Sequence, residues 1–348
     1  MTREELFARV ESAEPICDES LDGADLRGAD LSGAIFERVS FRGADLTGAR
    51  LHESLFSDCR FEGARLAGAR LRHGTWDRCT FLAADLGEAD IVAASLIACD
   101  LSRACLDGAN LTLASLVQAR LEETSLKGAN LDRTALIETD APRADFEGAN
   151  LVQTVLLKAD LSTARLRGAR LERTMLMGGK LAGQDLSGMT LTQAQLMDVD
   201  LTGCDLRGAK MSQVGFKGAR LPGARLDGAD LERALFIEAD LRGATLTGAK
   251  LDQALFIKAR LEDASLAGAS AYQAIFKGAS CPGATFAGAD LTYADFSHAD
   301  LTRADFSRCK LFRARFHRTI EQDTRFTDRS AALGDDQELL EAERRSES

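Results

Sequence analysis

The chain has 348 residues, a net charge of −11 and four prolines. No run approaches the roughly 18 consecutive apolar residues of a membrane helix. The first residues, MTREELFARVESAEP, lack the basic and apolar regions of a secretory signal. A cytoplasmic location is therefore the default expectation. The acidity lies mainly at the ends, because residues 1–20 carry −4 and residues 319–348 carry −5.

Residues 1–20 are predicted to form an N-terminal helical cap. Thr2 and Glu5 have the spacing of a capping box, in which each side chain accepts from a backbone N–H group. Leu6, Phe7 and Val10 follow as an apolar helical stripe. Such a helix would cover the first open edge of the repeat array that follows, where unpaired strand groups invite aggregation.

Residues 21–318 repeat every five residues without a change of phase. Of the 60 positions from Leu21 to Phe316, all but Ala141, Ala271 and Cys281 hold Leu, Phe, Ile, Met or Trp. We call these the central positions. A small residue, usually Ala, stands two places before each, with Gln184 and Met189 as bulky exceptions. A period of five fits neither a helix nor a plain strand, but it fits a chain that turns a right angle in each pentad.

A second period of 20 residues predicts the size of one coil. Glycine occupies position 28 and each twentieth residue to 288, failing only at Glu88. A glycine column at one corner suggests a positive φ, as in the third residue of a type II turn. Four pentads per coil predict an all-β solenoid, a right-handed quadrilateral parallel β-helix of about 15 coils. The rise of about 4.8 Å per coil is the ordinary strand spacing.

Residues 319–348 are predicted to be an acidic C-terminal tail with a short helix. In the stretch 335–345 the acids come first and the arginines last, as the helix dipole favours. Leu333, Leu339 and Leu340 are candidates for docking this helix against the coils.

Neither the histidines nor the cysteines form a recognised catalytic or metal-binding pattern. His52, His73, His298 and His317 fall at outward or corner positions, which predicts solvated histidines; a chance metal contact between His298 and His317 is the alternative. Cys59, Cys79 and Cys99 lie 20 residues apart at small positions, which favours reduced thiols in place of alanine. No catalytic, cofactor-binding or metal site is predicted, and the chain is not expected to be an enzyme.

One outward column is apolar where the others are polar. The residue after the central position is apolar in eight of nine successive coils, with Lys217 as the interruption. Apolar residues before the central position lie on the same face. The predicted partner-binding residues are Ile97, Val117, Ile137, Leu157, Met177, Met197, Ile237, Ile257, Val155, Met175, Leu235, Leu255 and Ile275. A patch of the order of 400 Å² on a soluble monomer usually has a binding role. The alternatives are tolerated surface hydrophobes or partial cover by the C-terminal tail.

A neighbouring face carries glutamines with arginines between them. They are Gln153, Gln193, Gln213, Gln253 and Gln273 with Arg133, Arg173 and Arg233. Stacked amides can bond to one another along the column, so structural support is the simpler interpretation. A polar rim beside an apolar strip is also typical of a binding face.

The pentad A-(D/N/R)-L-x-G, as in Ala24-Asp25-Leu26-Arg27-Gly28, resembles that of the pentapeptide-repeat proteins over residues 21–318. The resemblance implies the quadrilateral β-helix and no shared catalytic residue. The stretch Ser297 to Arg303, the segment Leu311-Phe312-Arg313-Ala314 and the end from Ala332 to Glu343 are similar to the branch associated with bacterial type VI secretion. Other members of the family mimic DNA and modulate type II topoisomerases such as gyrase.

Two functions remain open at this point. The first is a scaffold that binds a protein partner, or itself, through the apolar face, with a secretion system as its setting. The alternative is a DNA mimic, which requires a continuous acidic face, whereas residues 21–318 carry only −2. No basic patch favours direct nucleic-acid binding, and no membrane is expected as a partner.

Overall fold

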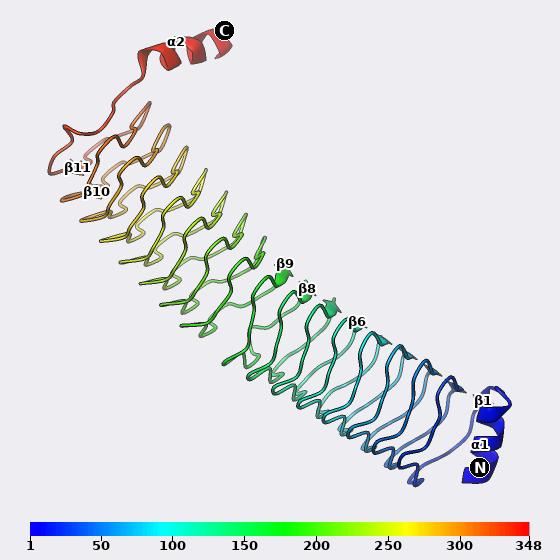
Figure 1. Cartoon of the computed structure of the whole chain (residues 1–348). Helices are drawn as coiled ribbons and strands as arrows, with labels where there is room; N and C mark the ends of the chain where they lie inside the picture. The colour runs from blue at the N-terminus through cyan, green and yellow to red at the C-terminus, as the bar shows by residue number, and fades with distance from the viewer. Residues whose placement is uncertain (348) are drawn as a thin grey trace. The chain divides into compact units, whose positions relative to one another are not determined.

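The computed structural model describes residues 1–347, which form two compact units. Unit 1 is Met1–Lys180 and unit 2 is Leu181–Ser348. Each is a stack of four-sided coils of the predicted parallel β-helix (Figure 1), and together they contain about 16 turns. Among the described residues, neither helix is long and apolar enough to cross a bilayer.

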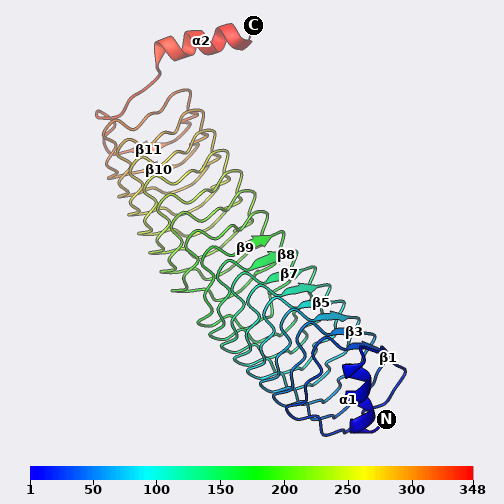
Figure 2. The same cartoon turned by 45° about the vertical axis from the view of Figure 1, so that its right-hand side comes forward.

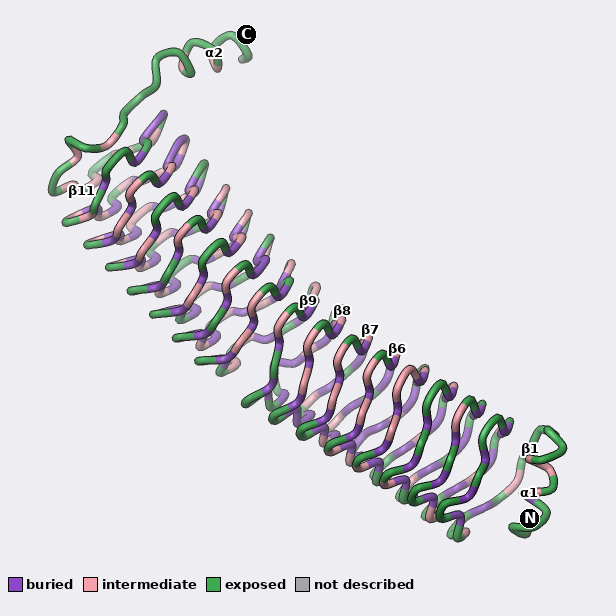
Figure 3. Tube along the Cα trace, in the orientation of Figure 1, coloured by how far each residue is buried: buried purple, intermediate pink, exposed green. Residues whose placement is uncertain are grey.

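The pentad of Ala44 to Gly48 shows how one side of a coil is built. Ala44 and Leu46 point inward and are fully buried, while Gly48 lies at the corner with φ of +66°. The N–H of Ala49 donates to the carbonyl of Leu46 at 2.9 Å and closes the turn. The N–H groups of Leu46 and Gly48 donate to the next coil, to the carbonyls of Arg65 and Ala67. Burial therefore alternates with exposure around every coil (Figure 3).

Unit 1 begins with helix α1, Arg3–Glu11, and both hydrogen bonds of the Thr2–Glu5 capping box are present. Leu6 is fully buried. Arg9 binds the carbonyl of Pro15 at 2.9 Å and the carboxylate of Glu19 at 3.4 Å, which holds α1 against the first coil.

One side of unit 1 forms a parallel sheet of nine short strands in sequence order (Figure 2). Each strand pairs in register with the residues 20 positions further on, so that Ile97 faces Val117 and Val117 faces Ile137. The strands are β1 Ile16–Cys17, β2 Ile35–Glu37, β3 Leu55–Ser57, β4 Thr75–Asp77, β5 Ser95–Ile97, β6 Ser115–Val117, β7 Ala135–Ile137, β8 Val155–Leu157 and β9 Met175–Met177.

The regular ladder extends beyond both predicted ends. Ile16 is fully buried and pairs with Phe36, so the coils begin at β1 rather than at Leu21. In unit 2, β10 (Asp305–Phe306) pairs with β11 (Arg325–Phe326), which lies beyond residue 318. The segments 1–20 and 319–348 therefore each contribute backbone to the β-helix as well as a helix.

Unit 2 joins its coils through single β-bridges and ends in helix α2, Gln337–Glu347. Its core holds a continuous aromatic column with neighbouring ring centroids 4.6–5.3 Å apart. The rings are Phe216, Phe236, Phe256, Phe276, Phe296 and Phe316. Leu339 of α2 is 36% exposed and Leu333 is 46% exposed. Leu340, the third leucine predicted to dock the helix, is half-buried, and polar contacts, described below, also hold α2.

Candidate interaction surface

The outward side of strands β5–β9 carries a continuous apolar column in unit 1. Strand pairing places one residue of each strand directly above the next, because all four pairings are parallel and in register. We call this column, with two residues beside it, the unit 1 apolar face. Its members are Ile97, Val117, Ile137, Leu157, Met177, Val155 and Met175. Four steps of about 4.8 Å make it about 19 Å long.

The face becomes more apolar along the sheet. On β5 and β6 the second outward residue is a serine, Ser95 or Ser115. On β8 and β9 both outward residues are apolar. Ile97 is 38% exposed and Met175 is 41% exposed, while the other five members are half-buried by their neighbours in the column. The richest part of the face is therefore β8 and β9.

Charged and amide side chains border this face. Beside the column, the ammonium of Lys158 lies 3.6 Å from the carboxylate of Glu138, which accepts from the amide of Gln118 at 3.3 Å. Both signs of charge are present, as in the polar rim of a protein interface. A separate shallow hollow lies over β2–β4, where Ile35 and Leu55 are 38% and 45% exposed.

Unit 2 carries six of the predicted residues, and we call them the unit 2 apolar face. Bridges align Leu235, Leu255 and Ile275. All six are half-buried, and they are Met197, Ile237, Ile257, Leu235, Leu255 and Ile275.

The apolar column is interrupted at Gly215 and Lys217. A Cβ atom at Gly215 would collide with the side-chain oxygen of Gln195, and one at Gly218 would collide with the carboxylate of Asp198. Side chains of the preceding coil thus lie over this part of the backbone, and their flexible ends would have to shift for a larger residue. The unit 2 apolar face is therefore less continuous than the one in unit 1.

The glutamine column of unit 2 is hydrogen-bonded in two stretches, from Gln193 to Gln213 and from Arg233 to Gln273. The amide of Gln193 donates to Gln213 at 3.1 Å, and that of Gln253 donates to Gln273 at 3.1 Å. Arg233 donates to Gln253 at 2.8 Å. These contacts are those of the structural interpretation, in which stacked amides tie adjacent coils together.

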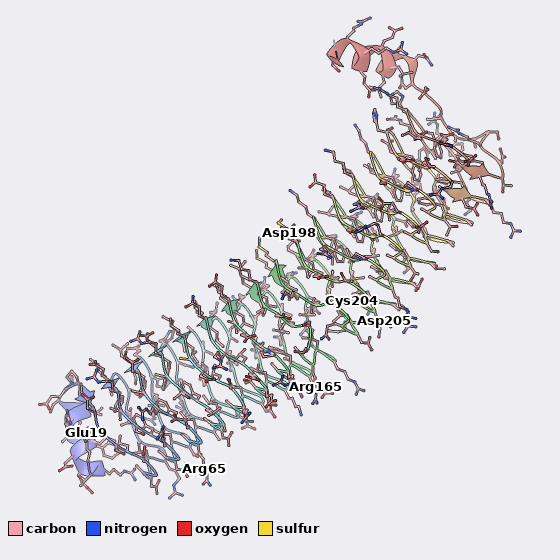
Figure 4. All side chains as sticks on the ribbon, turned by 180° about the vertical axis from the view of Figure 1, so that it is seen from behind. Glu19, Arg65, Arg165, Asp198, Cys204 and Asp205 are labelled. Carbon is pink, nitrogen blue, oxygen red and sulfur yellow. The ribbon has the colours of Figure 1, made fainter. Side chains whose placement is uncertain are left out.

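The aspartates before the central positions have a local structural role. The carboxylate of Asp205 accepts the N–H of Arg207 at 3.2 Å, and that of Asp240 accepts the N–H of Arg242 at 3.2 Å. The Arg207 side chain also bonds to Asp205 and holds the pKa of that carboxyl below its usual range. Asp205 and Asp198 lie on different sides of their coils (Figure 4).

Acids and bases also neutralise one another between coils. In unit 1, Arg65 lies 3.9 Å from Asp45, and Arg165 lies 3.4 Å from Asp145. Both arginines project outward from their coils (Figure 4). Exposed pairs of this kind contribute little to stability, but they prevent a column of one charge.

The eight cysteines are all free thiols. Cys59, Cys79 and Cys99 are buried in one column, and each thiol lies 3.3–3.6 Å from the carbonyl of the residue 23 positions earlier. Cys204 of unit 2 makes the same contact with Leu181 at 2.9 Å, and burial raises the pKa of its thiol to about 11. A thiol at the small position therefore fills the place of alanine and adds a weak hydrogen bond to the neighbouring coil.

The prediction of four solvated histidines is wrong for His317. Its side chain is fully buried, although the position faces outward. The polypeptide from Asp335 to α2 covers it, with the N–H of Asp336 donating to Nδ1 at 3.2 Å and Glu343 lying 3.4 Å from Nε2. His298 is half-buried beside it. Burial here depends on where the tail lies, which the five-residue period does not specify.

Several solved structures resemble the chain at low TM-score. QnrB1, a plasmid-mediated fluoroquinolone resistance protein, is 21% identical over 55% of this chain and 95% of its own, with a TM-score of 0.30. HetL, involved in heterocyst differentiation regulation in the cyanobacterium Nostoc sp. strain PCC 7120, is 28% identical over 83% of this chain and 96% of its own, with a TM-score of 0.18. A pentapeptide repeat protein of the Arabidopsis thaliana thylakoid lumen is 30% identical over 38% of this chain and 69% of its own, with a TM-score of 0.21.

Comparison with curated proteins finds no match. The sequence model described as Pentapeptide repeats (8 copies) matches in overlapping segments from residue 20 to residue 213 and from residue 216 to residue 318. These matches span the coils of both units. The coils show the features that the repeat requires, which are buried Ala and Leu positions and corners that face outward. The chain belongs to the pentapeptide repeat family.

Proposed function

We propose that this protein is a non-catalytic binding protein that docks a protein partner through the unit 1 apolar face. The observation that carries the proposal is the in-register column on β5–β9, with apolar residues at both outward positions of β8 and β9. A patch of aliphatic and Met side chains inside a polar rim is the usual anatomy of a protein interface.

The chemistry of the rim favours a protein over a lipid surface. Membrane-surface proteins place Lys and Arg around the apolar face to contact anionic headgroups. Here Glu138 neutralises Lys158, so this flank of the column carries no excess positive charge. The core positions hold mostly Ala, Leu and Phe, and burial raises the pKa of the inward Cys204 thiol to about 11, which disfavours its reactive thiolate form. An accessory role in a bacterial type VI secretion system is the finer form of this proposal and rests on the C-terminal sequence segments.

The alternative, modulation of a type II topoisomerase by DNA mimicry, has less support. Its requirement is a continuous acidic column, whereas Asp200, Arg220, Asp240 and Arg260 alternate in sign along unit 2. The Asp residues also serve the turns, since each accepts the N–H two residues ahead. A supercoiling assay with gyrase tests this alternative, and inhibition by equimolar protein would favour it.

A variant with Ile137→Glu, Leu157→Lys and Met177→Glu tests whether the fold tolerates charges on this face, and cross-linking then tests the docking itself. Alternating charges mimic the neighbouring Glu138–Lys158 pair, so we expect the sheet to form and the circular dichroism spectrum to remain unchanged. A photo-reactive amino acid at position 157 should give a defined cross-linked product with the partner in cells. The same probe in a chain that carries both Ile137→Glu and Met177→Glu should give no such product.

The matched control is Leu113, which is 51% exposed at a corner outside this face. The probe at position 113 should give no such product, and Leu113→Glu should leave the product at position 157 unchanged. Light scattering measures the mass of the purified protein in solution and so shows whether the partner is a second copy of the chain or another protein. Equal cross-linking from positions 113 and 157, or a product that survives the charge substitutions, would contradict the proposal.

A further inference from the structure

Three potential metal ligands meet at the C-terminal end of unit 2. His298 and His317 lie on adjacent coils, and the N–H of His298 donates to the carbonyl of His317 at 2.8 Å. Glu343 comes from α2. One ligand atom from each of the three side chains lies within 4.8 Å of the other two. Helix α2 thus brings a carboxylate to a pair of imidazoles that the coil register has placed together.

Both imidazoles direct a nitrogen at this carboxylate. The Nε2 atom of His298 lies 3.1 Å from Oε1 of Glu343, and that of His317 lies 3.4 Å from Oε2. The two rings are nearly perpendicular, with centroids 5.5 Å apart. His317 is fully buried, so its orientation is fixed by its surroundings. Fixed donors lose little freedom when they bind a metal ion.

Asp335 lies near the second ring nitrogen of His317, within ion-pair distance but beyond the length of a hydrogen bond. Its carboxylate lies 3.7 Å from Nδ1 of His317, on the side of the ring away from Glu343. Metal-binding histidines usually donate their second N–H to a carboxylate, which fixes the tautomer and raises the basicity of the ligand. In the tautomer with a proton on Nδ1, that N–H would point toward Asp335 and Nε2 would be free to bind the metal ion. Nδ1 would then no longer accept the hydrogen bond that the N–H of Asp336 now donates to it.

Arg318 competes with a metal ion for Glu343. Its guanidinium donates to Oε2 at 3.0 Å, whereas Oε1 faces His298 and remains available to a metal ion. The acidic side chains around the imidazoles are Glu343, Asp335 and the nearby Asp336, and Arg318 forms an ion pair with the first of them. This balance tolerates one divalent cation.

We propose that His298, His317 and Glu343 bind a zinc ion that fixes α2 against the last coils of unit 2. Imidazole nitrogen and carboxylate oxygen are ordinary zinc ligands, and three of them leave a fourth position for water. Zinc–nitrogen bonds of about 2.0–2.1 Å place ligand atoms about 3.3 Å apart in a tetrahedron. Separations within 4.8 Å therefore close by a small shift of α2 together with a rotation of the half-buried His298 side chain.

The test is a calorimetric titration of the whole chain, freed of metal by a chelator, with zinc chloride. We expect one zinc ion per chain, and slower hydrogen exchange of the α2 amides once it is bound. Cobalt in place of zinc should give the visible absorption of a tetrahedral nitrogen–oxygen site. His298→Ala and Glu343→Gln should each weaken binding by at least about 10-fold, since each removes a ligand. Both positions are solvent-accessible enough for the coils to fold without them.

Two substitutions serve as matched controls. His73→Ala removes an exposed histidine of unit 1, and Glu341→Gln removes an exposed carboxylate of α2. Neither should change zinc affinity. Equal binding by wild type, His298→Ala and Glu343→Gln would show adventitious surface binding and overturn the proposal. The proposal would also fail if zinc left the hydrogen exchange of the α2 amides unchanged while Glu343→Gln sped up their exchange in the metal-free protein. That pair of results would show that the ion pair between Glu343 and Arg318 holds the helix without zinc. This test is independent of docking at the unit 1 apolar face.

Discussion

Unit 1 and unit 2 share one pentad, yet they close the same side of the coil differently. In unit 1 the residues from position 35 onward, repeated every 20, form the strands β2–β9, each followed by an open bend. In unit 2 the equivalent pentads form closed turns, as where the N–H of Ala219 donates to Phe216 at 3.0 Å and that of Ala239 to Phe236 at 3.2 Å. The continuous sheet, and with it the in-register apolar column, therefore occurs on this side of unit 1 and not on the equivalent side of unit 2, although both units are built from the same pentad.

The small residue on this side differs between the units. Unit 1 holds Cys59, Cys79, Cys99 and Thr139 there, and their thiols or hydroxyl contact carbonyls of the preceding coil. Unit 2 holds mostly Ala, which has no side-chain donor. The other residues of this column in unit 1 have no side-chain donor, yet they also follow strands; they are Val39, Ala119, Ala159 and Gly179. We interpret this as cooperation between coils, since each coil bonds to both neighbours and must adopt a compatible form.

The largest expected effect comes from the aromatic column of unit 2. Phe256→Ala removes a fully buried ring stacked between Phe236 and Phe276, and we expect a loss of about 3–5 kcal/mol in the free energy of unfolding. Leu136→Ala in unit 1 should cost about 2–5 kcal/mol, with no stacked ring to lose. Urea unfolding measures both values. A cost below about 1 kcal/mol for Phe256→Ala would mean that the column does not stabilise unit 2.

The next effect tests whether the small residue selects the form of the turn. Ala239→Thr introduces two heavy atoms at a fully buried position, and overpacking costs about 1–3 kcal/mol. If the hydroxyl also opens the bend, the amide of residue 239 loses its bond to Phe236 and exchanges faster with solvent. Hydrogen exchange followed by NMR measures this. A destabilised variant that retains a protected amide at 239 would show that residue size alone matters.

The converse substitution in unit 1 should cost less. Thr139→Val keeps the shape and removes the hydroxyl, which donates to the carbonyl of Leu116 at 3.1 Å. A neutral hydrogen bond contributes about 0.5–1.5 kcal/mol, so we expect a loss of about 1 kcal/mol in urea unfolding. Thr75→Val is the control at a partly exposed outward position of β4. Equal losses for the two substitutions would remove the special role of the inward hydroxyl.

Much of the fold could be predicted from the sequence because each coil repeats the same local chemistry. The periods of five and 20 predicted the inward residues, the corners with positive φ and the vertical alignment of Ile97 with Val117. The form of the turn could not be predicted, because Ala119 follows a strand and Ala219 closes a turn. The burial of His317 could not be predicted either, since it depends on a tail that has no repeat.

The smallest expected effect is a loss of stability in acid. It should distinguish turns in which an Asp carboxylate accepts the backbone N–H from turns in which an Asn side chain accepts it. Asp205 and Asp240 of unit 2 accept an N–H as carboxylates, and hydrogen bonds from the arginines two residues ahead hold their pKa values below the usual range. Their contribution to stability is therefore complete above about pH 4 and is lost as the pH falls through the lowered pKa. In unit 1, Asn130 and Asn150 accept the same N–H at 3.2 and 3.3 Å and do not titrate.

We therefore expect acid to weaken the coils around Asp205 and Asp240 before those around Asn130 and Asn150. Protection factors of the turn amides, measured by hydrogen exchange between about pH 6 and pH 3 and corrected for intrinsic rates, test this order. Asp205→Asn should keep the acceptor and make its turn insensitive to pH, with only the exposed ion pairs to Arg207 and Arg225 lost. An equal loss of protection at the turns of Asn130 and Asp205 would contradict this prediction. It would mean that acid destabilises the whole coil, through the core or the charged columns, and that protonation of the turn carboxylates adds nothing.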